Sequence, residues 1–267
     1  MTETAQAELH YEVAGEGPPV VLVHEGIADS RMWEPQWTSF PPVHRTVRYD
    51  MRGFGESPPP SGSFSHARDL VDLIESLALA PVALVGGSVG GAVALDVTVV
   101  CLELVSALAL VGSGLRGHEF SAETQAGWAE EEEAFERGDL DAAVETNLRM
   151  WVDGPRRSPE EVDPDLRRRV GEMQRRALEL AQSAEGEPTL EVLAPDYPER
   201  LGEIAVPALI LVGELDRPEM HEIADRLKSG IRNARSATID ATAHVPSMER
   251  PAEFDELVLG FLAEVQQ

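Results

Sequence analysis

Hydrophobic residues along this chain fall into short aliphatic runs that alternate with longer segments of helical character. Continuous runs with β-branched members predict buried strands, because a sheet covered on both faces needs apolar side chains on both. The predicted strands lie at residues 8–14, 19–24, 45–50, 81–87, 104–112, 206–213 and 234–240. The predicted helices between and after them lie at 65–79, 89–101, 218–229 and 251–265. This alternation predicts an α/β fold with a mostly parallel sheet and helices on both of its faces.

The pattern changes between residues 115 and 203. No aliphatic run typical of a strand occurs there, and three strongly charged stretches at 122–137, 140–151 and 164–184 predict long helices instead. The run of glutamates at 130–133 is typical of a solvated helix face, so we assign it no binding role. We therefore expect a core made of residues 1–114 and 204–267, with residues 115–203 as a helical insertion.

The joint between the strand at 81–87 and the helix after it carries the first candidate for chemistry. Residues 86–90 read Gly-Gly-Ser-Val-Gly and match the pattern Gly-x-Ser-x-Gly. A serine on such a strained turn is lifted above the sheet edge, and small neighbours let the helix pass close to the strand. The N–H of Val89 would point at an anion forming near Ser88. The alternative is a glycine-rich turn without chemistry.

A serine hydroxyl is a weak nucleophile, so it needs a base and a group that orients the base. His244 lies in a loop of small residues after the strand at 234–240, with room for its ring to reach into a cleft. Asp216 follows the strand at 206–213, and ligands of open α/β sheets bind at the carboxyl ends of strands. The candidate nucleophile, acid and base are therefore Ser88, Asp216 and His244.

Four landmarks in this order resemble the α/β-hydrolases, in the branch that holds bacterial esterases, cofactor-free haloperoxidases and carbon–carbon hydrolases. They are the segment 24–33 with His24, the loop 50–57 that reads Asp-Met-Arg-Gly-Phe-Gly-Glu-Ser, the turn at Ser88, and the pair Asp216 and His244. The resemblance implies the α/β-hydrolase fold, with residues 115–203 as a helical cap inserted after the family's sixth strand.

The resemblance also implies roles for the site residues. Ser88, Asp216 and His244 would form the catalytic triad, and the N–H groups of Gly26 and Val89 would form the oxyanion hole. His24 would fix its loop rather than act as a base. Apolar residues of the cap are expected either to line the pocket or to pack the cap, and they are Trp128, Phe135, Met150 and Trp151.

Glu25 follows His24 where members of the family that the chain resembles usually have a glycine. A carboxylate near the oxyanion site would oppose the charge of a tetrahedral intermediate. Alternatively, the side chain points to solvent, or it is protonated and donates a hydrogen bond. We expect Glu25 to be turned away from the cleft and to take no part in the chemistry, although it remains a candidate neighbour of the site.

Composition and charge indicate which classes of binding partner to expect. The net charge of −26 disfavours nucleic acids and anionic membranes through repulsion. No apolar run is long enough to span a membrane, and the first residues lack the features of a signal peptide, so we expect a cytoplasmic protein, as a monomer or homodimer. Cys101 reads as a small buried hydrophobe. Neither a dinucleotide fingerprint nor a cluster of metal ligands is present, so we expect no cofactor and no metal.

These observations predict a serine hydrolase that cleaves a carboxylic ester or lactone of a small to medium molecule through an acyl-enzyme on Ser88. Three alternatives remain open. The same triad would serve a carbon–carbon hydrolase or a perhydrolase, and Glu25 would suit a biosynthetic or ligand-binding member of the fold without hydrolytic turnover.

Overall fold

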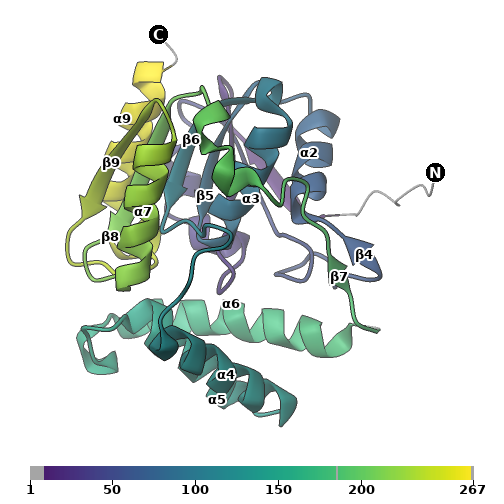
Figure 1. Ribbon diagram of the computed structural model, residues 1–267, viewed down its shortest axis with the longest axis vertical. Helices are drawn as coiled ribbons and strands as arrows, with labels where there is room; N and C mark the ends of the chain where they lie inside the picture. The colour runs from purple at the N-terminus through teal and green to yellow at the C-terminus, as the bar shows by residue number, and fades with distance from the viewer. Residues whose placement is uncertain (1–8, 185, 266–267) are drawn as a thin grey trace.

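The computed structural model describes residues 9–184 and 186–265, whose centre is a seven-stranded sheet (Figure 1). Its strands are β1 Tyr11–Ala14, β2 Pro19–Val23, β3 Arg45–Tyr49, β5 Val82–Gly87, β6 Val105–Val111, β8 Ala208–Gly213 and β9 Ala234–Ile239. They lie in the order β1-β3-β2-β5-β6-β8-β9. β1 pairs antiparallel with β3, and the other neighbours in this order are parallel. The predicted mostly parallel sheet is therefore confirmed.

Helices cover both faces of this sheet. They are α1 Gln36–Ser39, α2 His66–Ser76, α3 Val89–Val100, α7 Pro218–Gly230, α8 Pro246–Glu249 and α9 Pro251–Val265. Short 3-10 helices lie at Ser30–Trp33, Leu102–Leu104, Pro159–Glu161, Tyr197–Glu199 and Leu201–Glu203. α3 packs against β5 and α2, whereas α9 packs against β6 and α1. The four helices predicted outside the insertion are all present, with ends within a few residues of the predicted ones.

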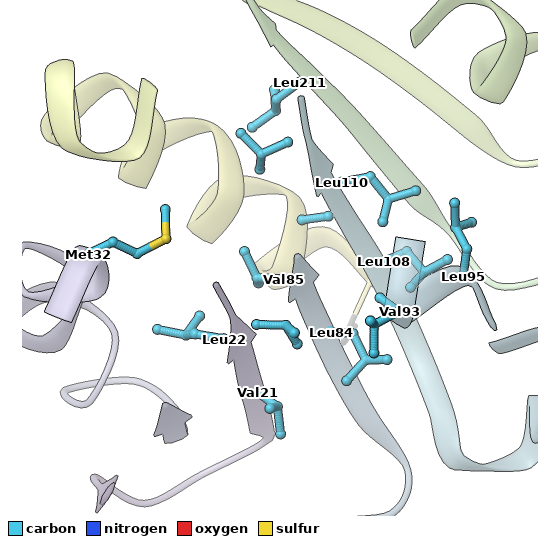
Figure 2. Close-up of a cluster of buried hydrophobic side chains, with 14 of the residues drawn as sticks. Val21, Leu22, Met32, Leu84, Val85, Val93, Leu95, Leu108, Leu110 and Leu211 are labelled. Carbon is cyan, nitrogen blue, oxygen red and sulfur yellow. The ribbon is translucent and has the colours of Figure 1, made fainter. Parts of the chain in front are cut away.

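The core lies between the sheet and these helices. All residues of β5 and of β8 are buried, as the continuous aliphatic runs predict. Figure 2 shows Leu108 beside Val93 and Leu95 of α3 on one side of the sheet, with Leu22 and Met32 on the other. Each fully buried side chain of this size stabilises the fold by roughly 1.5–3 kcal/mol. The central strands, and with them the loops at their carboxyl ends, are therefore the most firmly held part of the molecule.

Residues 115–203 carry three further helices that pack on one another at one end of the sheet (Figure 1). They are α4 Ala122–Glu136, α5 Leu140–Asn147 and α6 Pro164–Ser183. The predicted helical stretch at 140–151 is present but changes its type, because α5 ends at Asn147 and a π-helical turn follows at Leu148–Asp153. The carbonyl of Trp151 in this turn accepts a hydrogen bond from the N–H of His244, a long-range contact that helical propensity does not encode.

A small two-stranded sheet was not predicted. β4, Ser63–Phe64, pairs in parallel with β7, Thr189–Leu190, and thereby ties the insertion to the core. This pairing corrects the expectation that residues 115–203 hold no strand. The strands are two residues long, and backbone bonds such as that from the N–H of Thr189 to the carbonyl of Gly62 hold them, so no side-chain pattern marks them.

Two further findings concern the described part of the chain. No helix in residues 9–184 and 186–265 combines the length and the apolar character needed to cross a membrane. No group of three or more potential metal ligands gathers within the same residues. The expected start of the first strand, residue 8, lies outside the described residues.

Candidate active site

Ser88 lies between β5 and α3 in a backbone conformation that side-chain-bearing residues rarely adopt. Its φ is 47° and its ψ is −113°. The N–H of Ser88 donates to the carbonyl of Val111 over 2.9 Å, and its carbonyl accepts from the N–H of Gly114 over 2.9 Å. Because one bond goes to the last residue of β6 and the other to the chain just after it, the neighbouring strand holds the strained turn in place. Ser88 is half-buried and faces a cavity.

The glycines of the turn are explained by close backbone approach. A Cβ at Gly90 would lie 2.4 Å from the carbonyl oxygen of Val23 and 2.5 Å from that of His24. No side chain fits at such distances, so α3 is able to start directly above β2 only with glycine at this position. The sequence pattern thus reflects a steric need, whatever chemistry Ser88 performs.

Asp216 and His244 meet at the carboxyl ends of β8 and β9. The Nδ1 of His244 donates to Oδ2 of Asp216 over 2.8 Å, and Oδ1 of Asp216 accepts from the N–H of Arg217 over 2.8 Å. The two loops are tied together by a bond from the N–H of Leu215 to the carbonyl of Thr242. His244 is 2% exposed and Asp216 1%, so little water competes for this hydrogen bond.

Burial and charge act on His244 in opposite directions. Burial lowers the pKa of the imidazole, because it penalises the charged form. The charge and hydrogen bond of Asp216 outweigh burial, with smaller contributions from Glu25 and Glu249, and raise the pKa of His244 to about 9. A histidine with this partner is a stronger base than a free imidazole, and in the neutral form of the ring its other nitrogen, Nε2, takes the proton.

One cavity of about 440 Å³ brings the predicted site residues together. Ser88, His244, Gly26 and Val89 all line it. A Cβ at Gly26 would lie 3.0 Å from Cγ2 of Val89, so the two residues expected to form the oxyanion hole are neighbours. Asp216 is not among the lining residues and lies behind His244. This volume suits a small to medium organic molecule.

The cap residues expected beneath the insertion divide into two groups. Trp128 and Trp151 line the cavity, and the ring of Trp151 lies 4.6 Å from that of His244 between centroids. Met150 is buried against Gly127 instead, and Phe135 packs against the apolar core. The two tryptophans therefore shape the cavity, whereas the other two residues pack in the protein interior.

Glu25 is fully buried, so the placement toward solvent is wrong. Its side chain lies against the turn, where a Cβ at Gly87 would be 2.7 Å from Cγ and 2.9 Å from Oε1 of Glu25. It does not line the cavity, and neither carboxyl oxygen has a hydrogen-bond partner among the described residues. Burial, with Asp216 and Glu249 adding to it and His244 opposing it, raises the pKa of Glu25 to about 8. The carboxyl is therefore mostly protonated at pH 7.

The preceding residue, His24, bridges two loops. Its Nδ1 donates to the carbonyl of Glu25 over 2.8 Å, and its Nε2 accepts from the N–H of Met51 over 2.9 Å. Burial lowers the pKa of His24 and keeps the ring neutral, as this donor–acceptor pair requires. Both ring nitrogens are thus occupied in holding the loop that carries Gly26.

The sequence missed three polar residues of the cavity wall. Glu131 of α4, Asn147 of α5 and Gln174 of α6, together called the polar cap cluster, line the same cavity as Ser88. This corrects the interpretation of the glutamate run at 130–133 as wholly solvated. Charged helical stretches give no sign of which polar residue turns inward, because the inward face is set by how the three helices pack.

The chain is similar to known hydrolases over most of its length. A model of the alpha/beta hydrolase family matches residues 20–257. A "putative carbamate hydrolase RutD" of Azorhizobium caulinodans is 26% identical over 276 residues, covering 98% of this chain and 97% of that protein. A "2-hydroxy-6-oxo-6-(2'-aminophenyl)hexa-2,4-dienoic acid hydrolase" of Metapseudomonas resinovorans is 38% identical over 114 residues, covering 40% of this chain and 39% of that protein.

Solved structures agree with this assignment at the level of the fold. The enol-lactonase of Burkholderia xenovorans matches with a TM-score of 0.79 at 23% identity, covering 97% of this chain and 99% of that one. The α/β-hydrolase fold predicted from the sequence is thereby confirmed. The match over residues 20–257 leads to one conclusion: the chain belongs to the alpha/beta hydrolase family and is a hydrolase enzyme.

Proposed function

We propose that the protein is a serine hydrolase that cleaves an ester-like bond, a carboxylic ester or a lactone, through an acyl-enzyme on Ser88. The observation that carries the proposal is the arrangement of three side chains. The buried pair of Asp216 and His244, joined over 2.8 Å, opens onto the same cavity as a serine held on a strained turn. A nucleophile, a base and a group that orients the base are the parts that acyl transfer requires.

In the first half of the reaction, Oγ of Ser88 attacks the substrate carbonyl while Nε2 of His244 accepts the serine proton. The charge of Asp216 stabilises the imidazolium that forms. The N–H groups of Val89 and Gly26 donate to the oxyanion. Collapse of the intermediate breaks the bond to the leaving oxygen, which takes the proton from His244.

In the second half, water attacks the acyl-enzyme, again with His244 as the base. The new tetrahedral intermediate collapses and returns the proton to Oγ of Ser88, which releases the acid. The cap, residues 115–203, covers Ser88 and limits the access of bulk water, so that the developing charges are stabilised by fixed groups.

Glu25 takes no direct part in this scheme, because its carboxyl does not reach the cavity. With its pKa raised to about 8, the carboxyl is mostly protonated at pH 7 and adds little negative charge beside the oxyanion. This removes the electrostatic objection that its sequence position raises.

Covalent labelling tests the proposal. A fluorophosphonate should add one adduct to the wild-type protein, seen as a mass increase of the intact chain, and should add none to Ser88→Ala. A wild-type protein that stays unlabelled, or a Ser88→Ala variant labelled as fast as the wild type, would refute the role of Ser88. Retained folding of the variant is checked by circular dichroism.

A second candidate function, carbon–carbon bond hydrolysis, is favoured by one observation. The relative that is 38% identical over 114 residues is named as a hydrolase of a hexadienoic acid. Its reaction class would use the same cavity and Ser88. Comparing aryl esters with a vinylogous diketone at equal concentrations separates the two, since an ester hydrolase turns over the esters alone.

A further inference from the structure

Three polar side chains from the cap gather on one wall of the cavity above Ser88. Trp128, Trp151, Leu115 and Met220 account for much of its lining. The polar cap cluster, in contrast, brings one carboxyl and two amide side chains to the cavity from three different helices, α4, α5 and α6. Polar side chains that converge from separate elements on a cavity are the usual means by which a site orients a ligand.

The hydrogen bonds around the cluster use three of the four N–H groups of its two amides. The Nε2 of Gln174 donates to Oε1 of Glu131 over 3.4 Å, and the Nδ2 of Asn147 donates to the carbonyl of Ala143 over 3.3 Å. The Asn147 amide also hydrogen bonds to the carboxyl of Glu131. Gln174 is 5% exposed and its Oε1 is buried without a partner among the described residues. What the cluster offers to the cavity directly is therefore an acceptor oxygen of Glu131, while Oε1 of Gln174 lies buried just behind the cavity wall.

An unpaired buried acceptor is costly, at about 1–3 kcal/mol. Apolar side chains would pack three helices at least as well as a carboxyl and two amides. A donor on a bound molecule would satisfy a free oxygen of Glu131, and a turn of the Gln174 side chain toward the cavity would bring Oε1 to the same donor. Burial raises the pKa of Glu131, while the hydrogen bonds from Asn147 and Gln174 act against this and support the carboxylate.

From these contacts we propose that the polar cap cluster binds a hydroxyl or ammonium group at the end of the substrate remote from the carbonyl that Ser88 attacks. The inference rests on the proposed function for the position of that carbonyl. It names the substrate class as esters or lactones whose acyl part carries a hydrogen-bond donor. An ammonium gains additional attraction from the carboxylate of Glu131, because the cavity is partly shielded from water.

A competing ligand chemistry is present in the same cavity. Arg116 also lines it, and its guanidinium would favour a substrate that ends in a carboxylate. The side chain of Arg116 is exposed, however, and lies over the ring of Tyr197 at 5.9 Å from its centroid. Water screens an exposed cation, so the buried acceptors are the stronger determinant.

The test compares aryl esters with acyl chains matched in length, which end in methyl, hydroxyl, ammonium or carboxylate, over a range of lengths. At the best length, the hydroxyl and ammonium esters should exceed the methyl ester about tenfold in kcat/KM, which corresponds to one good hydrogen bond to a charged or buried acceptor. Glu131→Gln should abolish the advantage of ammonium over hydroxyl, and Gln174→Met should reduce the advantage of both over methyl.

Glu132→Gln is the matched control, since Glu132 is the exposed neighbour of Glu131 on α4 and does not line the cavity. It should leave the preference order unchanged. A methyl or carboxylate ester as the best substrate, or equal preferences in Glu131→Gln and Glu132→Gln, would overturn the proposal.

A binding measurement separates this proposal from the proposed function. In the Ser88→Ala background, n-hexylamine should bind in calorimetry, and adding Glu131→Gln should weaken that binding about tenfold. Such binding supports the cluster even if no ester in the series is hydrolysed, in which case only the proposed chemistry fails. If n-hexylamine does not bind, or if Glu131→Gln does not change its binding, the proposed role of the polar cap cluster is contradicted, even if a fluorophosphonate labels Ser88.

Discussion

The two sides of the cavity are built by different means. On the core side, Ser88 is positioned by backbone, through bonds to Val111 and Gly114 at the end of a buried strand. On the cap side, the polar cap cluster consists of side chains on helices that pack mainly on one another. A backbone position that a sheet holds is hard to move. A side chain on the surface of a helix, in contrast, is replaced by substitution without a change in the backbone. We infer that the core side carries the reaction, and that the cap side selects the substrate.

The largest effect is expected from a substitution on the core side of the cavity, at Ser88. Ser88→Ala should reduce kcat by about 10⁶-fold on an activated aryl ester, because the triad acts as a unit. Steady-state kinetics with a mock preparation as background measure this loss. Substitution within the polar cap cluster should instead change relative kcat/KM among substrates. A loss of only a few fold in Ser88→Ala would place the reaction elsewhere.

The pH dependence sharpens the account of the core side. His244 accepts a proton only when neutral, and Asp216 raises its pKa above the ordinary value of about 6.5. Activity should therefore fall as pH decreases, by up to about tenfold per pH unit, along a limb whose midpoint lies between about 6.5 and 9. The kcat/KM profile of the wild type on a neutral ester measures this midpoint. A midpoint at or below 6.5 would contradict the coupling to Asp216.

Glu25→Gln tests a group on the core side that the mechanism does not use. A carboxyl whose pKa is raised on folding binds its proton more tightly in the native state, so stability falls as pH rises from about 4.5 to about 8. The slope from this group is at most about 1.4 kcal/mol per pH unit. Urea unfolding of both proteins across this range should show a steeper fall of stability with pH in the wild type than in the variant, because other groups such as His244 contribute equally to both.

The same variant should keep kcat/KM at pH 7 within about threefold of the wild type, since Glu25 is mostly protonated there. Stability curves that run parallel for the two proteins would mean that Glu25 is ionised at low pH and paired in a way that the structure does not contain.

The smallest effects are expected on stability, when one helical glycine on each side of the cavity is replaced by alanine. Gly90→Ala in α3 should destabilise by about 1–3 kcal/mol, since its Cβ would meet backbone carbonyls. Gly171→Ala in α6 should stabilise by about 0.5–1 kcal/mol, since its Cβ would make ordinary contacts at 3.4 Å with Leu148 and Val144. Thermal unfolding of both variants measures the opposite signs. Equal signs would contradict the difference between the two sides.

This contrast also explains what the sequence predicted. The turn at Ser88 follows from glycines that backbone contacts require, and the strands follow from aliphatic runs that a covered sheet requires, so local patterns carry both. The burial of Glu25 depends on Gly87, which leaves space for its side chain, and no local pattern links these two positions. The inward turn of Glu131 depends likewise on how α4 packs against α5 and α6.

The central claim, that Ser88 forms a covalent acyl intermediate, is tested most directly by trapping it. An activated aryl ester is mixed with the wild-type protein, quenched in acid within the first turnover, and the digest is analysed by mass spectrometry. The account predicts a mass increase equal to the acyl group on the peptide that contains Ser88. Ester turnover that proceeds with no acylated peptide, or with the acyl group on another residue, would contradict it.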